Sequence, residues 1–222
     1  MANVSYQSFL PEVMPHVQGA PEPQVVNAVR DAAVEFCERS WVWIADTAPI
    51  GVTAGTADYA IVSPDSNAAI AEYLYGYWNN KQVDPIARDV LDKEHCGWKT
   101  RTGTTPMKFM ARDAMTGVTL IPIPSLTVAP GPTTLYFTVA LKPLRSQASG
   151  VPDWLYEKYL EDIGHGAISR MQMITGQRWS NANAALAHKK LFDDAIGKAR
   201  SKAAKSFTRA ALRNRAYGVA RW

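Results

Sequence analysis

The spacing of apolar residues changes twice along this 222-residue chain, from helical to strand-like and back to helical. A helix over residues 23–40 is predicted by apolar positions at i, i+3, i+7 and i+10, which are Val26, Val29, Ala33 and Phe36. Residues 42–142 contain short alternating runs with frequent turn signals, typical of strands. Helical spacing returns at residue 151. This order predicts an α+β fold.

The middle region predicts two hairpins. One has its turn at Asn79-Asn80, because asparagine tolerates the positive φ angles of a tight turn. The second has its turn near residues 113–117. Further strands are expected at residues 43–50, 58–62 and 134–141, and a short helix at 87–95. We expect a small antiparallel sheet or sandwich, with Tyr73, Tyr75 and Tyr77 on one face of a strand.

Two helices are predicted after residue 150. An apolar stripe marks the first helix, with Gly176 as a candidate C-cap; the stripe is Leu155, Tyr159, Ile163, Ala167, Met171 and Ile174. The second helix begins at an N-cap formed by Ser180 or Asn181 and extends for about 30 residues, or about 45 Å. Its second half has few apolar residues, so we expect it to project beyond the body.

The expected architecture is therefore a helical bundle, built from N- and C-terminal helices, with an antiparallel β-rich insertion and a C-terminal helical arm. The prolines among residues 1–21 favour an extended lead-in rather than a core element. The expected boundaries are 1–41 for the lead-in and first helix, 42–150 for the insertion, 151–197 for the C-terminal helices and 198–222 for the arm.

The end of the chain is strongly basic. Residues 198–222 contain no acidic side chain and eight basic ones, Lys198, Arg200, Lys202, Lys205, Arg209, Arg213, Arg215 and Arg221. The whole chain carries +4, so residues 1–197 carry a net charge of −4. Such a segment can be a solvated tail, a segment that binds nucleic acid, or a helix that docks on a protein. Docking on a protein is favoured because the segment also contains apolar residues that would serve as anchors, namely Phe207, Leu212, Tyr217 and Trp222.

Catalytic motifs are absent from the sequence, which contains no GxSxG, Walker or dinucleotide-binding pattern. The four histidines are widely separated, and Glu94-His95-Cys96 lacks the spacing of a metal site. The Gly164-His165-Gly166 sequence favours close helix packing over phosphate binding. We therefore expect neither an enzyme nor a cofactor; a metal-dependent hydrolase around Glu94-His95-Cys96 is a remote alternative. No apolar stretch reaches the length of a membrane span. A membrane-surface helix at the basic end ranks last among its interpretations, because alanine inserts weakly into a membrane, and no membrane partner is expected.

Several segments, in order, resemble the bacteriophage head-tail adaptor (connector) proteins. They are LPEV (residues 10–13), AVRDAAVEFCERSWVW (28–43), Gly55 and Tyr59, Trp98 ahead of GTTPMKF (103–109) and TLIPIP (119–124), and VPDWLYEKYLEDIGHGAISRMQMITGQRWSN (151–181). The resemblance implies a structural virion protein at the head-tail interface, in a ring, commonly of twelve subunits, beneath the portal protein.

The resemblance also implies the partners. They would be the portal, the neighbouring adaptor subunits and the downstream tail or nozzle proteins, with transient contact to genomic DNA in the lumen. The segment from Leu191 to Trp222 would be the portal-docking arm. A ring of arms would multiply weak contacts through effective concentration, so assembly would occur on the portal rather than in solution. The alternative from another class is a nucleic-acid-binding module that uses the basic tail.

Overall fold

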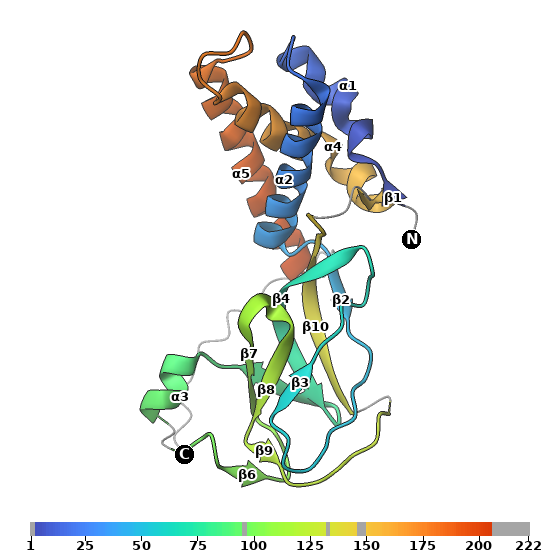
Figure 1. Ribbon diagram of the computed structural model, residues 1–222, viewed down its shortest axis with the longest axis vertical. Helices are drawn as coiled ribbons and strands as arrows, with labels where there is room; N and C mark the ends of the chain where they lie inside the picture. The colour runs from blue at the N-terminus through green and yellow to red at the C-terminus, as the bar shows by residue number, and fades with distance from the viewer. Residues whose placement is uncertain (1–2, 95–96, 132–133, 146–149, 206–222) are drawn as a thin grey trace.

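In the computed structural model, most helices gather at one end of the molecule and the strands at the other (Figure 1). The structure describes residues 3–94, 97–131, 134–145 and 150–205. The helical elements are η1 (Tyr6–Phe9), α1 (Leu10–Val13), η2 (Met14–His16), α2 (Glu22–Ser40), α3 (Arg88–Glu94), η3 (Asp113–Met115), α4 (Asp153–Gln172) and α5 (Ala182–Ala204). Within these described ranges, no helix has both the length and the apolar character needed to cross a membrane.

Seven strands form one sheet in the order β2-β10-β4-β5-β7-β8-β3. Their bounds are β2 (Ile44–Asp46), β3 (Asp58–Ala60), β4 (Ala68–Trp78), β5 (Lys81–Pro85), β7 (Lys108–Ala111), β8 (Gly117–Ile121) and β10 (Leu135–Pro143). Neighbouring strands are antiparallel except β5 and β7, which are parallel. Two small pairs join β1 (Asn3–Val4) to β11 (Val151–Pro152) and β6 (Thr102–Gly103) to β9 (Ile123–Pro124).

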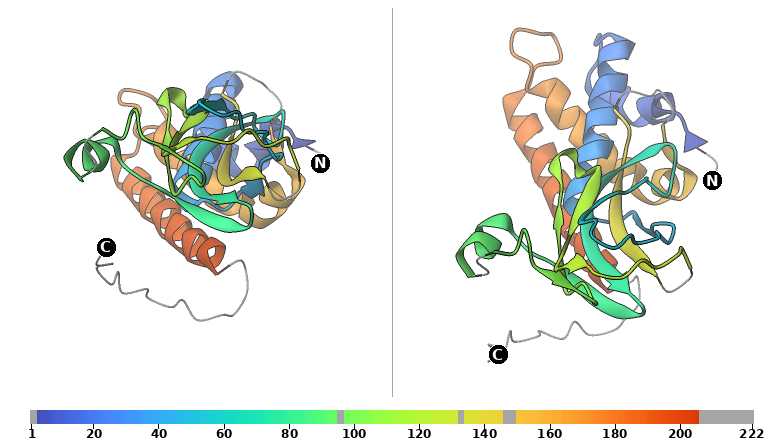
Figure 2. Two further views of the ribbon diagram at one scale, coloured as in Figure 1. Left: turned by 90° about the horizontal axis from the view of Figure 1, so that it is seen from below. Right: turned by 60° about the horizontal axis from the view of Figure 1, so that its bottom comes forward.

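The sheet is strongly curled (Figure 2), and many of its apolar side chains are buried. Phe137 of β10 lies fully buried there, with ring centroids 5.0 Å from Phe109 and 5.7 Å from Tyr73. The Tyr73 hydroxyl donates a hydrogen bond to the Met115 carbonyl at 2.9 Å, which ties β4 to the segment between β7 and β8. These contacts give the sheet a dense aromatic interior of its own.

One hydrophobic core runs through both ends of the molecule. Phe36 of α2 and Phe192 of α5 belong to the same buried cluster as Phe109 and Phe137 of the sheet. Helix α2 packs on β10, and the Leu141 amide donates to the Trp43 carbonyl at 2.7 Å where the two ends meet. The sheet is therefore packed continuously with the helices.

The expected helical bundle with an antiparallel β-rich insertion is wrong, although the broader α+β class is consistent with the structure. The largest element is the curled seven-stranded sheet, and its β5–β7 pair is parallel. The expectation failed because periodicity identifies single strands but does not show which strands pair. The connection through α3 returns the chain beside β5 in the same direction.

Several local predictions are confirmed. Helix α2 covers Glu22–Ser40, one residue longer than predicted. Asn79 and Asn80 have φ angles of 47° and 62° in the β4–β5 turn. The second predicted hairpin is the antiparallel pair β7–β8, which is joined through η3. The Asn181 side chain caps α5 by accepting a hydrogen bond from the Ala184 amide at 3.1 Å.

The extended lead-in is also wrong, because residues 6–16 form three short helical turns that bury Phe9 and Val13. Pro11 and Pro15 occupy first-turn positions of these helices, where a missing amide hydrogen costs no internal hydrogen bond. Gly176 is not the C-cap of α4, since that helix ends at Gln172.

The three tyrosines of β4 do not share one face. Tyr73 is buried, whereas Tyr75 is 48% exposed. The pairing with β10 shifts between Tyr73 and Tyr75, so Leu74 is an extra residue in the strand. Such a bulge reverses the alternation of side chains along a strand, and apolar spacing does not reveal it.

Candidate functional site

The basic segment predicted to dock begins within helix α5, which is packed along most of its described length. Its buried side chains are Ala185, Phe192, Ala195, Ile196, Ala199 and Ala203. The Phe192 ring lies where α2, α4 and α5 meet, because a Cβ atom built on Gly166 would stand 2.7 Å from that ring and 3.0 Å from the Ala32 Cβ. Gly166 thus serves close helix packing, as the sequence predicted.

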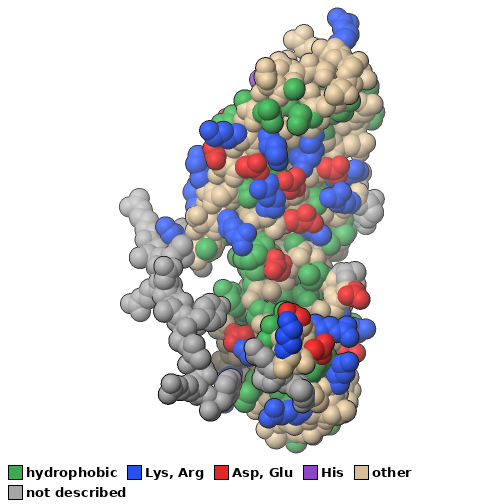
Figure 3. Space-filling model, turned by 90° about the vertical axis from the view of Figure 1, so that its left-hand side faces the viewer, with side chains coloured by type: hydrophobic (Ala, Val, Ile, Leu, Met, Phe, Trp, Pro, Cys, Tyr) green, Lys and Arg blue, Asp and Glu red, His purple; other side chains and the backbone are tan. Residues whose placement is uncertain are grey.

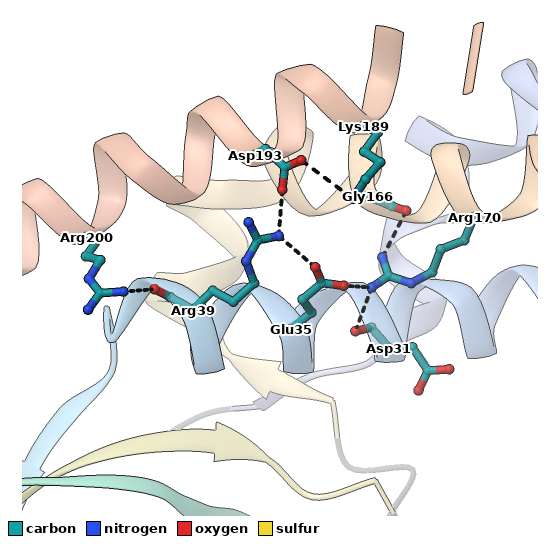
Figure 4. A network of polar contacts seen from close by, with 8 residues as sticks. All are labelled: Asp31, Glu35, Arg39, Gly166, Arg170, Lys189, Asp193 and Arg200. Carbon is teal, nitrogen blue, oxygen red and sulfur yellow. Dashed lines mark hydrogen bonds and ion pairs between the residues drawn. The ribbon is translucent and has the colours of Figure 1, made fainter. Parts of the chain in front are cut away.

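A network of ion pairs joins α5 to α2, and α2 in turn to α4 (Figure 4). The Arg39 guanidinium of α2 donates to Asp193 of α5 at 2.5 Å and to Glu35 at 2.7 Å. Glu35 also accepts from Arg170 of α4, and Lys189 lies 3.5 Å from Asp193. The network pairs side chains of opposite charge, and the Arg39–Asp193 pair helps to hold α5 along α2.

The ion pairs around Asp193 shift the pKa of its carboxyl group. Burial alone would raise its pKa, but the hydrogen bond and charge of Arg39 lower the net pKa below its usual value. The hydrogen bond to Asp193 is also the largest cause that raises the pKa of Arg39. Both partners therefore favour their charged forms, although their partial exposure limits the stabilisation to about 1 kcal/mol or less.

The described basic residues at the end of α5 face different surroundings. The Arg200 guanidinium lies 4.0 Å from the centroid of the Trp41 ring, a cation–π contact, and donates to the Arg39 carbonyl at 3.5 Å. Lys198 and Lys202 are close enough to Asp162 of α4 for their charges to lower its pKa, although burial raises it overall. Lys205 follows the helix, and its amide donates to the Lys202 carbonyl.

The face that α5 presents to solvent carries Lys and Arg side chains interspersed with Asp and Glu (Figure 3). The structure therefore places the exposed Arg200 against Trp41 at the surface and leaves Lys198 and Lys202 near Asp162. The other predicted docking residues lie outside the described residues; they are Phe207, Arg209, Leu212, Arg213, Arg215, Tyr217, Arg221 and Trp222. The last described turn of the helix is buried along Ala199 and Ala203 rather than projecting free, contrary to expectation.

Three histidines that the sequence separates lie together at the helical end. The Nδ1 atoms of His165 in α4 and His188 in α5 are 3.1 Å apart, so one ring donates and the other accepts. The His16 ring centroid of η2 lies 5.3 Å from that of His188. No sequence signal pointed to this cluster, because it depends on how three elements pack. Among the described residues, no group of three or more His, Cys, Asp or Glu side chains could hold a metal ion.

The histidine cluster predicts a loss of stability in acid. Burial, then the charges of His165 and His16, lower the pKa of His188 below its unfolded value of about 6.5. As the pH falls below about 6.5, the unfolded chain binds this proton before the folded chain does, so the free energy of unfolding should fall. His188→Gln should reduce that fall between pH 7.5 and pH 5.5, measured by urea unfolding.

Other charged groups near His188 also affect the pH dependence of stability, so wild type and His188→Gln must be compared over the same pH range. Burial raises the pKa of Asp162, although the charges of Lys198 and Lys202 lower it. The folded chain therefore takes up this proton more readily than the unfolded chain. Its effect on stability in acid is opposite in sign to that of His188. These groups are present in both proteins, so the difference between wild type and His188→Gln reports His188 together with its coupling to His165 and His16. Equal pH dependence in the two proteins would refute the role assigned to His188.

The sequence profile of the SU10 adaptor protein family matches residues 4–216. The chain belongs to the SU10 adaptor protein family. A comparison with curated proteins finds no match. The family match begins at the residues of β1 and extends past α5 into the predicted docking segment. The resemblance to phage adaptors is thereby confirmed.

Membership in the SU10 adaptor family makes this protein a bacteriophage adaptor, a structural component of the virion. In this SU10 adaptor, the described structure shows how α5 is fixed to the body, and the family match includes most of the basic segment that follows it. His95 and Cys96 of the alternative metal site lie outside the described residues.

Proposed function

We propose that this adaptor forms a ring beneath the portal and joins the capsid to the tail, with its basic C-terminal segment docking on the portal. The family match across residues 4–216 carries the proposal, because it covers both the folded body and most of the basic segment. The role is structural rather than catalytic. Downstream tail or nozzle proteins would bind the ring, and genomic DNA would pass through it.

The attachment of α5 supports a docking role for the residues that follow. Phe192 and the Arg39–Asp193 pair hold the helix on α2 and α4, and the helix remains packed as far as Ala203. The chain therefore leaves α5 from a fixed point beside the sheet (Figure 2). A fixed attachment point sets where the residues that follow can reach, which raises their effective concentration at a neighbouring portal site.

The charge of the segment indicates an acidic portal surface. Residues 206–222 contain four arginines and no acidic residue, together with Phe207, Leu212, Tyr217 and Trp222 as apolar anchors. One segment of this length buries little area and would bind weakly. A ring presents many such segments to a symmetric portal, so the assembled complex would be stable although each contact is weak.

The experiment mixes the purified adaptor with the portal protein from the same genome and images the complexes by electron microscopy. The full-length protein should form rings at one end of the portal, whereas a chain truncated after Lys205 should not. Truncation at this position keeps the buried Ala199 and Ala203, so the body should remain folded. A matched full-length variant with Arg209, Arg213, Arg215 and Arg221 changed to Glu tests charge alone, and it should also fail to bind.

Two results would count against this proposal. Rings that form equally well with the truncated chain would show that the segment does not dock on the portal. If neither chain associates with the portal, the ring itself is wrong. Circular dichroism and thermal unfolding of each variant would show whether the body is intact.

The second candidate function is nucleic-acid binding through the same segment, favoured by eight basic residues and no acid in residues 198–222. This function predicts that the logarithm of the DNA association constant falls linearly with the logarithm of salt concentration, at a slope of about −0.9 per phosphate contact. Truncation after Lys205 should then make this slope less steep. Binding that is weak and independent of the segment would exclude this function.

A further inference from the structure

A second, smaller apolar cluster lies under helix α3, apart from the main core. Leu91, Trp98 and Ile121 are its buried members. They line a hollow of about 600 Å³, together with Met107, which is 59% exposed at its mouth. An apolar hollow of this size has room for an apolar side chain from another molecule.

Two basic side chains are among those that line this hollow. Arg101 and Lys108 line it, and Lys99 lies over the Trp98 ring at 5.7 Å. Lys108 is paired with Asp84 at 3.2 Å, whereas Arg101 forms no ion pair with any described residue. The side of the molecule that carries α3 shows Lys and Arg side chains beside apolar and acidic ones (Figure 3). An occupant with an acidic residue next to an apolar one would match this surface.

The segment between β3 and β4 offers such a pair. Val62 is 81% exposed, the most exposed of the large apolar side chains in the described ranges. Asp65 follows three residues later, and its Oδ1 accepts a hydrogen bond from the Asn67 amide at 2.8 Å. The Ser63 hydroxyl donates to the Asp65 carbonyl at 2.9 Å. These bonds hold the loop in a defined shape, which lowers the entropic cost of binding.

The two surfaces lie on opposite sides of the molecule. Helix α3 and the β3–β4 segment are on opposite sides of the strand-rich end (Figures 1 and 2). The hollow lies beside α3, because Leu91 of that helix lines it. Complementary patches on different faces of one chain make a head-to-tail contact, which closes into a ring when the rotation between copies permits it.

We propose that the β3–β4 segment of one subunit binds the α3 hollow of the next subunit, with Val62 in the hollow and Asp65 beside Arg101. The proposal rests on the ring proposed above and specifies its lateral contact. The pairing buries an exposed valine on one copy and an exposed methionine on the other. It also gives Arg101 an acidic partner.

Disulfide cross-linking tests this contact directly. Val62→Cys and Met107→Cys are introduced together in a Cys96→Ser background, which leaves Cys37 as a buried thiol. Under mild oxidation on the portal, the double variant should give a ladder of covalent multimers on a non-reducing gel. Each single variant should give no species larger than a dimer, since it has one reactive position per chain.

Charge exchange gives a second, independent readout. Arg101→Glu and Asp65→Arg should each weaken self-association by about tenfold, and the double exchange should restore most of it. Asp65→Asn is the matched control, since it removes the charge but keeps the oxygen that caps the Asn67 amide. It should weaken association without altering the folded loop.

The outcomes separate this contact from the ring itself. If wild-type rings form on the portal but the cysteine pair gives no ladder, the lateral contact is wrong and the proposed function stands. The contact would also be wrong if the losses of self-association caused by Arg101→Glu and Asp65→Arg simply add in the double variant, with no recovery. If wild type forms no ring on the portal, the proposed function fails.

Discussion

Gly166→Ala is expected to lower the free energy of unfolding by about 1–3 kcal/mol, because the added methyl group overpacks the meeting point of three helices. The new Cβ would stand 2.7 Å from the Phe192 ring of α5 and 3.0 Å from the Ala32 Cβ of α2. Phe192 is buried and lies near both Phe36 and Arg170, so its ring has little room to move. Urea unfolding followed by circular dichroism measures the change.

Gly197→Ala is the matched control. It is also a glycine within a helix, α5, but a Cβ atom built there meets nothing within 4 Å. Alanine is favoured over glycine in a helix interior by about 1 kcal/mol, so this variant should be more stable than wild type. Opposite signs for the two substitutions would identify packing as the cause. A stabilised Gly166→Ala variant would show that the helices are not in close contact at this position.

Phe137→Ala is expected to cost about 3–5 kcal/mol, since it removes a fully buried aromatic ring and leaves a cavity in the curled sheet. The ring contacts Tyr73 and Phe109 within the sheet. Tyr136→Ala is the control on the neighbouring position of β10, where the ring stacks on Tyr77 with centroids 5.1 Å apart on a half-buried surface. This variant should cost about 1 kcal/mol.

The two sets of variants together test the continuity of the core. Phe36 and Phe192 of the helices share one buried cluster with Phe109 and Phe137 of the sheet. Thermal unfolding should therefore show a single transition, which Gly166→Ala and Phe137→Ala both shift to lower temperature. Two transitions, each shifted by one variant only, would show that helices and sheet unfold separately.

The sequence was most informative where structure depends on neighbours in the chain. Helix α2 follows from the spacing of its apolar residues, and the β4–β5 turn follows from Asn79 and Asn80. The Asn181 cap of α5 is equally local. The basic segment was also evident from sequence, and the ordered series of weak matches indicated the adaptor family that the profile match confirms.

Other features were hidden because their causes lie far apart in the chain. The parallel β5–β7 pair and the bulge at Leu74 depend on strand pairing, which apolar spacing does not specify. His16, His165 and His188 meet only because η2, α4 and α5 pack together. The same holds for the contact of Arg200 in α5 with Trp41, which follows α2.

The sequence by itself thus determined the local elements, the charge asymmetry and the family, because each is a property of residue type and spacing. Tertiary structure alone decided that the sheet is the largest element, that α5 is packed through Ala203, and that α3 and the β3–β4 segment lie on opposite sides. These features arise from burial of surfaces contributed by distant segments. Their free energy depends on contacts that no short stretch of sequence contains.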